Sequence, residues 1–529
     1  MKAIILAAGQ GTRLRPLTEN KPKCMVEFQG KPIIDHLIET FRLCGIDDIV
    51  VINGYQGDML ESHLEGHNIR FVRNEAYDTT NMVYSLFCAT DEFDDDLIIS
   101  YSDIIYSPKI LRQLMANPAP MSVAIDLNWK QLWDIRMEGI LSDAETLKIS
   151  PQGHIYEIGL KPESLEEIEG QYIGLISVRS ESLAAMKAVY DDLDARQING
   201  RSRPNIFMTD LLQEVINSGM NISADTFNGG WIEIDSLTDL SMYNEHITTL
   251  PGWKWQHLLE PICQLAMDAG EEIMTYYGDV QVEFRKEDES PLTKADLAAN
   301  CVILEGLQTF KDQYPIISEE NIKPSDWIDR TEWDTYWIVD PLDGTKEFLK
   351  NGDDFTVNIA LIHNNFPVLG VIFAPAHELL YFASENWGSF RLDLKHRQKK
   401  SLCVSEPLGA LTVLISSSHP TAELQNYLKN LPVHKCIPMG SSLKICKIAD
   451  GEADIYPRLG PLSEWDIAAA NVILTEAGGY LLDYHGNSIS YDSANGRIQS
   501  FAAAATESIA SFPNSIKKTI KLRLKGQVV

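Results

Sequence analysis

Three short, uniformly apolar segments near the N-terminus constrain the fold most. They cover residues 3–8, 49–52 and 97–100. Apolar residues between 33 and 41 recur at three- and four-residue spacing, so an amphipathic helix is expected between the first two segments. Strands that are apolar on both faces must be covered on both faces, which is typical of a parallel sheet with helical crossovers. The first half of the chain is therefore predicted to be an α/β domain.

A short breaker stretch at residues 248–252 separates two halves with different patterns. The second half opens with two expected helices, at about 258–277 and 295–310, and continues with apolar strands at 336–339 and 355–362. A chain of 529 residues is also too long for a single core. We expect one domain over residues 1–248 and a second over residues 253–529.

Composition narrows the range of partners and compartments. The 45 Lys and Arg residues against 75 Asp and Glu residues give a net charge of −30, and no basic stripe offsets it, so nucleic acid is not expected as a partner. The basic stretch 517–525 is expected to be a solvated tail or edge strand. Small anions remain suitable ligands, because a local basic cluster or a bound metal can reverse the sign inside one cleft.

The cysteines and the apolar segments bear on the compartment. The eight cysteines stand singly without a CxxC pair, which is typical of a reduced, cytoplasmic protein. The apolar segment 3–8 is far shorter than the roughly 20 residues of a membrane span and lacks a signal-peptide pattern. We therefore expect a cytoplasmic protein with small-molecule ligands and no membrane partner, and homo-oligomerisation stays open.

A glycine-rich turn follows the first apolar strand. Gly9 and Gly11 let the backbone turn sharply and bring N–H groups near phosphate oxygens, while Arg13 and Lys23 add two cations where a triphosphate would lie. A glycine pair alone is often purely structural. Here, GxGTRLxPLT followed by KPKxM resembles the signature of the sugar-phosphate nucleotidyltransferase superfamily, which implies a Rossmann-like nucleotidyltransferase domain. The nucleotide-binding residues implied by this resemblance are Leu6, Ala8, Gly9, Gly11, Thr12, Arg13, Lys23 and Asp103.

Two carboxylates and a lysine complete this resemblance. Asp103 and Asp235 match the positions at which the family binds magnesium, and Lys161, in a Lys-Pro pair, matches a lysine that contacts the acceptor phosphate. Mg²⁺ prefers oxygen ligands, bridges phosphates and neutralises charge during in-line attack on the α-phosphorus. Taken singly, Asp103 could be a turn residue and Asp235 a helix N-cap. The resemblance implies catalytic roles for Arg13, Lys23 and Lys161.

Residues 74–86 bear on the choice of acceptor. They resemble the cytidylyltransferase branch that activates phosphocholine and similar compounds, which implies CTP as the nucleotide. Trp129 and Trp133 follow that branch as substrate-binding residues and could enclose a quaternary ammonium by cation–π attraction, although packing roles are as plausible. Segments 23–27 and 80–83 look at least as close to the phosphoglutamine enzyme. We therefore expect L-glutamine phosphate as the acceptor, with phosphocholine next, and a CDP-linked product plus pyrophosphate.

The second half carries a separate set of acidic motifs: ISEE at 317–320, WIVDPLDGTKEF at 337–348 and EWDIAAA at 464–470. Together they resemble the inositol-monophosphatase superfamily, most closely its 3′(2′),5′-bisphosphate nucleotidase branch, which implies a layered α/β domain. Carboxylates this close would repel one another without a metal between them, and an all-oxygen site suits Mg²⁺. The metal ligands implied by the resemblance are Glu319, Asp340, Leu342, Asp343 and Asp466.

The same resemblance assigns the remaining phosphatase residues. Two or three Mg²⁺ ions would clamp the phosphate and lower the pKa of a bound water, which Thr345 and Glu319 would orient and deprotonate beside Asp296. The substrate-binding residues are Gly344, Thr345, Lys444, Tyr456 and Arg458; the last three could hold a second phosphate or belong to a charged surface. Glu320 and Glu347 are expected outside the metal site.

The two motif sets predict a bifunctional enzyme, an Mg²⁺-dependent cytidylyltransferase joined to an Mg²⁺-dependent 3′-nucleotidase. The pairing suggests a CDP-linked group that is phosphorylated at its 3′ position, used, and returned as 3′-phospho-CMP. Bacterial capsule phosphoramidate synthesis resembles this logic. Two alternatives stay open: a sugar-1-phosphate nucleotidyltransferase joined to an inositol- or sugar-phosphate phosphatase, or one half that is a non-catalytic nucleotide-sensing module.

Overall fold

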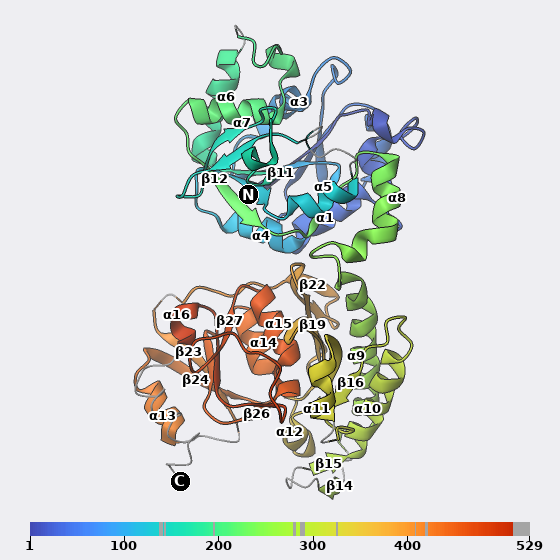
Figure 1. Ribbon diagram of the computed structural model, residues 1–529, viewed down its shortest axis with the longest axis vertical. Coiled ribbons are helices and arrows are strands. Elements are labelled where there is room, and N and C mark those ends of the chain that lie inside the picture. The colour runs from blue at the N-terminus through green and yellow to red at the C-terminus, as the bar shows by residue number, and fades with distance from the viewer. Residues whose placement is uncertain are drawn as a thin grey trace. The chain divides into compact units, whose positions relative to one another are not determined.

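The chain divides into two compact units, Met1–Lys254 and Trp255–Val529, in the computed structural model (Figure 1). The structure describes residues 1–136, 141, 144–193, 196–278, 282–285, 291–323, 326–407, 409–417 and 422–511. The basic stretch 517–525 lies outside these residues. Among the described helices, none combines the length and the apolar character that a bilayer crossing requires.

The first unit is built on a nine-stranded sheet. Its strands, in spatial order, are β5 (Ile69–Arg73), β4 (Ile49–Asn53), β1 (Lys2–Ala7), β6 (Leu97–Tyr101), β11 (Gln171–Val178), β8 (Met121–Asp126), β12 (Ile222–Phe227), β10 (His154–Ile158) and β9 (Leu147–Ile149). The three apolar segments form β1, β4 and β6, which pair in parallel as predicted. The sheet as a whole is mixed, because β11 runs antiparallel to both β6 and β8.

Helices cover both faces of this sheet, as the apolar strands require. The helices are α1 (Ile33–Leu43), α2 (Gly57–His63), α3 (Met82–Cys88), α4 (Pro108–Ala116), α5 (Trp129–Arg136), α6 (Ser180–Asp192), α7 (Met208–Asn217) and α8 (Leu237–His246). Apolar side chains of α3, α6 and α7 pack on one face, and Figure 1 shows α1 and α4 on the other. The helix expected around residues 33–41 is α1.

Two short strand pairs complete the first unit. One pairs β2 (Glu27–Phe28) with β3 (Lys31–Pro32), and the other pairs β7 (Ile104–Tyr106) with β13 (Trp231–Glu233). The second pair joins the segment that follows Asp103 to the segment that precedes Asp235 near the end of the unit.

The second unit contains two sheets. The larger has the strands β16 (Ile316–Ser318), β17 (Thr335–Asp343), β18 (Thr356–His363), β19 (Phe366–Ala374), β20 (Leu379–Ser384), β21 (Gly388–Asp393) and β22 (Gln398–Ser401) in that order. The smaller has the order β24 (Val433–Met439), β23 (Leu411–Ser416), β25 (Ile455–Arg458), β29 (Phe501–Ala504) and β27 (Tyr480–Asp483).

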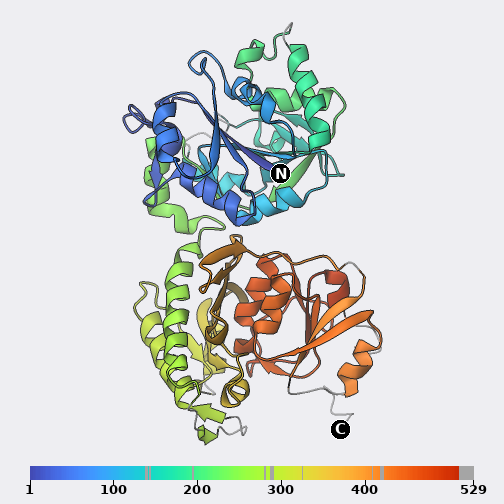
Figure 2. The ribbon, with the colours of Figure 1, turned by 180° about the vertical axis from the view of Figure 1, so that it is seen from behind.

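Helices alternate with these sheets in layers (Figures 1 and 2). The helices α9 (Leu259–Met274) and α10 (Lys294–Leu307) cover the outer face of the larger sheet. The helices α14 (Leu443–Ala449) and α15 (Ala468–Glu476) lie between the sheets in one continuous core, and α13 (Ala422–Leu428) and α16 (Glu507–Ala510) cover the smaller sheet. The layered α/β architecture predicted for this half is therefore confirmed.

The remaining elements of the second unit are short. They are α11 (Asp326–Asp329), α12 (Thr345–Leu349), the strand pair β14 (Val282–Arg285) and β15 (Pro291–Thr293), and the pair β26 (Leu462–Ser463) and β28 (Arg497–Ile498). The two expected helices correspond to α9 and α10, and the two expected strands lie in β17 and β18.

Candidate active sites

In the first unit, strand pairing brings Asp103 and Asp235 together. Ile104 of β7 lies opposite Glu233 of β13, and the Ile234 N–H donates to the Asp103 carbonyl at 2.9 Å. Asp103 precedes β7 and Asp235 follows β13, so the antiparallel pairing sets these two aspartates side by side.

Two cations face this pair of carboxylates. Lys23 Nζ lies 2.6 Å from Asp103 Oδ2 and also contacts Asp235 Oδ1, and Arg13 Nη1 lies 2.5 Å from Asp235 Oδ2. Burial disfavours the charge of Lys23, but Asp103, Asp235 and Glu233 outweigh burial and raise the pKa of Lys23. Asp103 Oδ1 is buried and has no hydrogen-bond partner among the described residues. A buried, unpartnered carboxylate oxygen fits a metal ligand.

A cavity of about 160 Å³ opens at this centre. The predicted nucleotide-binding residues that line it are Leu6, Ala8, Gly9, Lys23 and Asp103, and they are joined by Tyr77, Thr80, Asn81, Met82 and Ser85. Thr12 and Arg13 are exposed in a one-turn helix outside the lining, although Arg13 reaches Asp235. Gly11 has a φ of +58°, and a Cβ there would lie 2.7 Å from Lys23 Cβ, so this position requires glycine.

A second cavity, of about 180 Å³, shares Met82 and Tyr101 with the first. Its other lining residues include Trp133, Glu145, Tyr172, Trp231 and Glu233. Two contiguous cavities beside one pair of carboxylates suit a reaction that joins two substrates.

The two tryptophans of α5 pack against each other. Trp133 lines the second cavity, but Trp129 is only 1% exposed and is not among the described lining residues. Their ring centroids lie 5.9 Å apart at an interplanar angle of 82°, and the Arg136 guanidinium lies 5.1 Å from the Trp133 ring centroid. Trp129 therefore packs edge-on against Trp133, as the packing alternative has it, and its role in substrate binding stays a prediction. The cause of this packing is the helix α5, whose residues 129 and 133 stack one turn apart.

Lys161 is exposed and lines a third hollow of about 410 Å³, together with Glu145 and Arg201. Its ammonium group donates to the Leu141 carbonyl. Glu145 lines this hollow and the second cavity, so Lys161 lies beside the second cavity and outside its lining.

The sequence did not point to two charged residues of this centre, Glu233 and Arg136. Glu233 lines the second cavity, and its carboxylate lies 2.8 Å from Arg136 Nη1. Burial raises the pKa of Glu233, with Arg136 opposing and Asp103 adding to the increase. The available signal was a charged residue inside the apolar segment WIEI, since such a residue is seldom buried without a partner.

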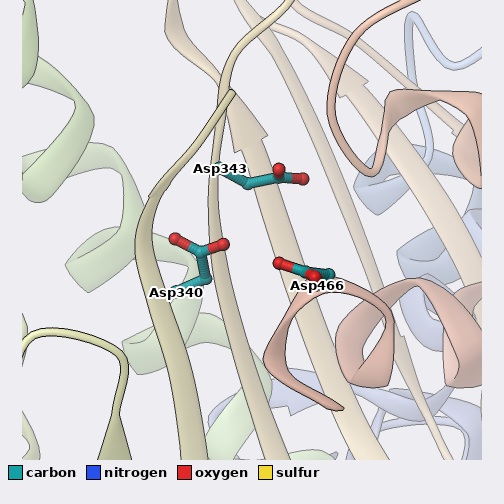
Figure 3. Close-up of side chains that lie close together, drawn as sticks. All are labelled: Asp340, Asp343 and Asp466. Atoms are coloured by element: carbon teal, nitrogen blue, oxygen red, sulfur yellow. The ribbon is translucent and has the colours of Figure 1, made fainter. Parts of the chain in front are cut away.

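In the second unit, the metal-binding aspartates expected from the sequence converge. The carboxylate oxygens of Asp340, Asp343 and Asp466 lie within 4.8 Å of one another (Figure 3). Residues three apart on a regular strand point to opposite faces. The pairing of β17 with β18 changes register between Asp340 and Asp343, and this irregularity lets both carboxylates face Asp466.

Backbone N–H groups hold these carboxylates. Ser442 N donates to Asp343 Oδ2 at 2.6 Å, Ser463 N to Asp466 Oδ2 at 2.8 Å and Leu342 N to Asp340 Oδ1 at 3.1 Å.

The electrostatics also fit a cation. Burial, with Asp343 and Glu319 adding, raises the pKa of Asp466 to about 8. Burial also raises the pKa of Asp343 to about 6, against the opposing charge of Lys444. Buried carboxylates whose ionised forms are destabilised in this way are stabilised by divalent cations.

The residues predicted to act on water lie at the same centre. Thr345 Oγ1 lies 3.3 Å from Asp296 Oδ1 and 3.1 Å from the Leu342 carbonyl, and it can donate to either. Asp296 is 1% exposed, and its other oxygen accepts from Thr293 N at 2.8 Å, closing the N-terminal capping box of α10. Glu319 follows β16, and its N–H donates to Val339 of β17 at 3.1 Å.

A cavity of about 190 Å³ is lined by two of the three aspartates, Asp343 and Asp466. The predicted substrate-binding residues Gly344, Lys444, Tyr456 and Arg458 line it together with Asp343 and Asp466. Lys444 is 6% exposed and lies 5.1 Å from the Tyr456 ring centroid. Burial, with Arg458 adding, lowers the pKa of Lys444 to about 8, although Asp343 opposes the change. Glu347, on the short helix α12, also lines this cavity and is not among the three clustered aspartates.

Comparisons with known proteins agree with these two centres. Residues 254–517 match the inositol monophosphatase family, and residues 3–153 match the MobA-like NTP transferase domain. The chain is 46% identical over 238 residues to the 3′(2′),5′-bisphosphate nucleotidase CysQ of Salmonella typhimurium, covering 44% of this chain and 94% of that protein.

The N-terminal half has its own relative. The CTP:phosphoglutamine cytidylyltransferase of Campylobacter jejuni is 42% identical over 253 residues, covering 46% of this chain and all (100%) of that protein. Among solved structures, CysQ from Bacteroides thetaiotaomicron is 35% identical, covers 47% of this chain and 97% of its own, and has a TM-score of 0.41.

Proposed function

Because its C-terminal half belongs to the inositol monophosphatase family and its N-terminal half carries a MobA-like NTP transferase domain, the chain joins a phosphatase to a nucleotidyltransferase, and we propose two specific reactions. The first half transfers CMP from CTP to L-glutamine phosphate. The second half removes the 3′-phosphate from 3′-phospho-CMP. The observation that supports this assignment is that each unit has its own acidic centre beside a cavity with cationic side chains.

In the first reaction, Asp103 and Asp235 would hold Mg²⁺, and the ion would supply positive charge that offsets the charge of the phosphates. The glycine loop donates N–H groups to the triphosphate, and Lys23 and Arg13 stabilise its negative charge. The acceptor phosphate, held by Lys161, attacks the α-phosphorus in line. The new phosphoanhydride bond forms as the bond to pyrophosphate breaks.

The lining of the second cavity can hold an amino-acid acceptor. Five aromatic side chains also line it (Tyr101, Trp133, Tyr172, Phe207 and Trp231), so the aromatic residues by themselves do not discriminate against a quaternary ammonium. Glu145 and Glu233 in the lining offer carboxylates that can pair with an α-ammonium group. The Campylobacter jejuni relative, matched over its full length, is named for phosphoglutamine.

In the second reaction, Glu319, Asp340, Leu342, Asp343 and Asp466 would hold two or three Mg²⁺ ions, which would supply Lewis-acid activation of a water molecule. Thr345 Oγ1 lies within hydrogen-bond distance of Asp296 and the Leu342 carbonyl and would orient that water. Glu319 would accept the proton of the water as its oxygen attacks phosphorus. The bond to the 3′-oxygen breaks, and CMP and phosphate are the products.

The cavity beside the aspartates supports a substrate with two phosphates. Lys444, Tyr456 and Arg458 line it together with Asp343 and Asp466 and can hold the 5′-phosphate. We further propose that the two activities serve one sequence of reactions, in which a CDP-linked group is phosphorylated at its 3′ position, transferred to a capsule or surface polysaccharide, and released as 3′-phospho-CMP.

Separate single substitutions should divide the two activities. Asp103→Asn is expected to lower CMP transfer at least about a hundredfold, about 3 kcal/mol, and to leave phosphatase activity intact; Asp340→Asn should do the reverse. The measurements are pyrophosphate release from CTP and phosphate release from 3′-phospho-CMP on the same preparations. If Asp103→Asn left pyrophosphate release unchanged, Asp103 would have no part in the transfer, and if the unaltered protein released no pyrophosphate, the first unit would be a nucleotide-sensing module.

The nucleotidase should lose efficiency at alkaline pH. Lys444 has a pKa of about 8, so its protonated, charged form is depleted above that pH and kcat/KM for 3′-phospho-CMP should fall. Lys444→Arg keeps its charge and should move this limit to higher pH. Lys447→Arg, on the same helix and paired with Glu452, is the matched control and should keep the original profile. An identical alkaline limit in Lys444→Arg would remove Lys444 from substrate binding.

The base preference tests the coupled sequence of reactions. We expect kcat/KM for 3′-phospho-CMP to equal or exceed that for 3′-phospho-AMP at equal Mg²⁺. A preference for the adenosine compound by more than about tenfold, about 1.4 kcal/mol in transition-state binding, would contradict the coupling and leave the phosphatase assignment intact.

The acceptor preference is tested by competition. With CTP and Mg²⁺, L-glutamine phosphate should give a CDP-linked product faster than phosphocholine at equal concentrations, since carboxylates in the described lining can pair with its α-ammonium group. Preferential use of phosphocholine would overturn the acceptor assignment alone.

A further inference from the structure

Arg136 is a buried cation at the end of α5 that the reaction scheme above does not use. Its side chain is 1% exposed, and it contacts two carboxylates. Arg136 Nη1 lies 2.8 Å from Glu233 Oε2, Nε lies 3.0 Å from Asp239 Oδ1, and Nη2 lies 3.4 Å from Asp239 Oδ2. The planar fork of arginine can hold two carboxylates at fixed angles, which a lysine cannot do.

Asp239 carries this interaction to the backbone of Asp235. Its Oδ2 accepts from Asp235 N at 2.9 Å and from Ser236 N at 2.8 Å, and Ser236 Oγ accepts from Asp239 N at 3.1 Å. These contacts form the capping box of α8. The position of Asp235 thus depends on Asp239, and Asp239 is held by Arg136.

The other side of Arg136 meets the second cavity. Glu233 and Trp133 line that cavity, and Arg136 contacts both of them from outside the lining. It forms an ion pair with Glu233, and its guanidinium lies 5.1 Å from the centroid of the Trp133 ring. Trp133 and Arg136 stand three residues apart on α5, so one turn of helix presents both to the same region.

The charges around Arg136 indicate why a buried cation is needed at this position. Glu233, Asp235, Asp239 and Asp103 are acidic and close, and Glu233 is raised in pKa by both Asp103 and Asp235. Arg136 compensates for this negative charge, and its own pKa is raised by Glu233, Tyr243 and Asp239 despite the opposing effect of burial. Removing it would leave buried carboxylates without their cation.

We infer that Arg136 is a positioning residue that fixes Asp235 through Asp239 and links the placement of this metal-binding carboxylate to the acceptor cavity through Glu233 and Trp133. The inference rests on the proposed cytidylyltransferase site. Arg136 is not among the lining residues of either cavity, so it acts through its partners.

The test uses the full chain with Arg136→Met and Arg136→Lys, and Arg70→Met as the control. Arg70 is another arginine of the first unit that pairs with two carboxylates, Asp48 and Glu92, but its side chain is 49% exposed. CMP transfer is followed as Mg²⁺ is varied, and again as L-glutamine phosphate is varied. CTP binding is measured by calorimetry with Mg²⁺ and with EDTA, which needs no turnover. Phosphatase activity and the thermal unfolding profile report on folding.

We expect Arg136→Met to raise the Mg²⁺ concentration for half-maximal CMP transfer about 10- to 100-fold, the range typical of residues that orient metal ligands. It should also weaken CTP binding in Mg²⁺ but not in EDTA. Arg136→Lys should recover part of the loss, and Arg70→Met should match the wild type. A normal Mg²⁺ dependence with only a higher KM for the acceptor would overturn the inference.

Two further outcomes are informative. Asp239→Asn and the double variant form a mutant cycle with Arg136→Met, and additive effects on Mg²⁺ dependence would also overturn the inference, because Arg136 is proposed to act through Asp239. If the protein transferred CMP to no acceptor, the proposed function would fail, but Mg²⁺-dependent CTP binding would still decide the role of Arg136.

Discussion

Repulsion between buried carboxylates is the constraint on which both centres depend. The first unit opposes its carboxylates with protein cations: Lys23 pairs with Asp103 and Asp235, Arg13 with Asp235, and Arg136 with Glu233. The second unit uses backbone N–H groups to hold Asp340, Asp343 and Asp466, and the raised pKa values of Asp343 and Asp466 show that repulsion and burial remain only partly offset. A divalent cation at the second centre would offset the remaining repulsion.

Helix capping is the device that places an aspartate in both centres. Asp235 precedes the capping box of α8, Asp466 is itself the last residue of a capping box with Ser463, and Asp296 closes the box at the start of α10. A capping box fixes a carboxylate through short backbone contacts, so its direction does not depend on a flexible side chain alone. The same interaction that begins a helix thus also fixes a functional oxygen.

Local sequence patterns predicted the elements better than their tertiary relations. The helices α1, α9 and α10 and the parallel pairing of β1 with β4 and β6 follow from apolar periodicity and burial. The antiparallel entry of β11 between β6 and β8 did not follow, because side-chain alternation is the same in either strand direction. The same limit explains why the structural roles of Trp129, Glu233 and Arg136 did not follow from the sequence. Their roles depend on which surface α5 and β13 meet, and no local spacing encodes that contact.

Because the chain is strongly acidic, a negatively charged ligand can be attracted into the cavity of either unit only by the cations that line it. A net charge of −30 gives no general attraction for nucleotides. Lys23 lines the first cavity, and Lys444 and Arg458 line the phosphatase cavity, each set beside the carboxylates it balances. These cations therefore have two roles, since they stabilise the acidic centre and also supply the only nearby positive charge that a phosphate meets among the described lining residues. A substitution that removes one of them changes both roles together, so loss of binding and loss of carboxylate placement are separable only by varying metal and substrate independently.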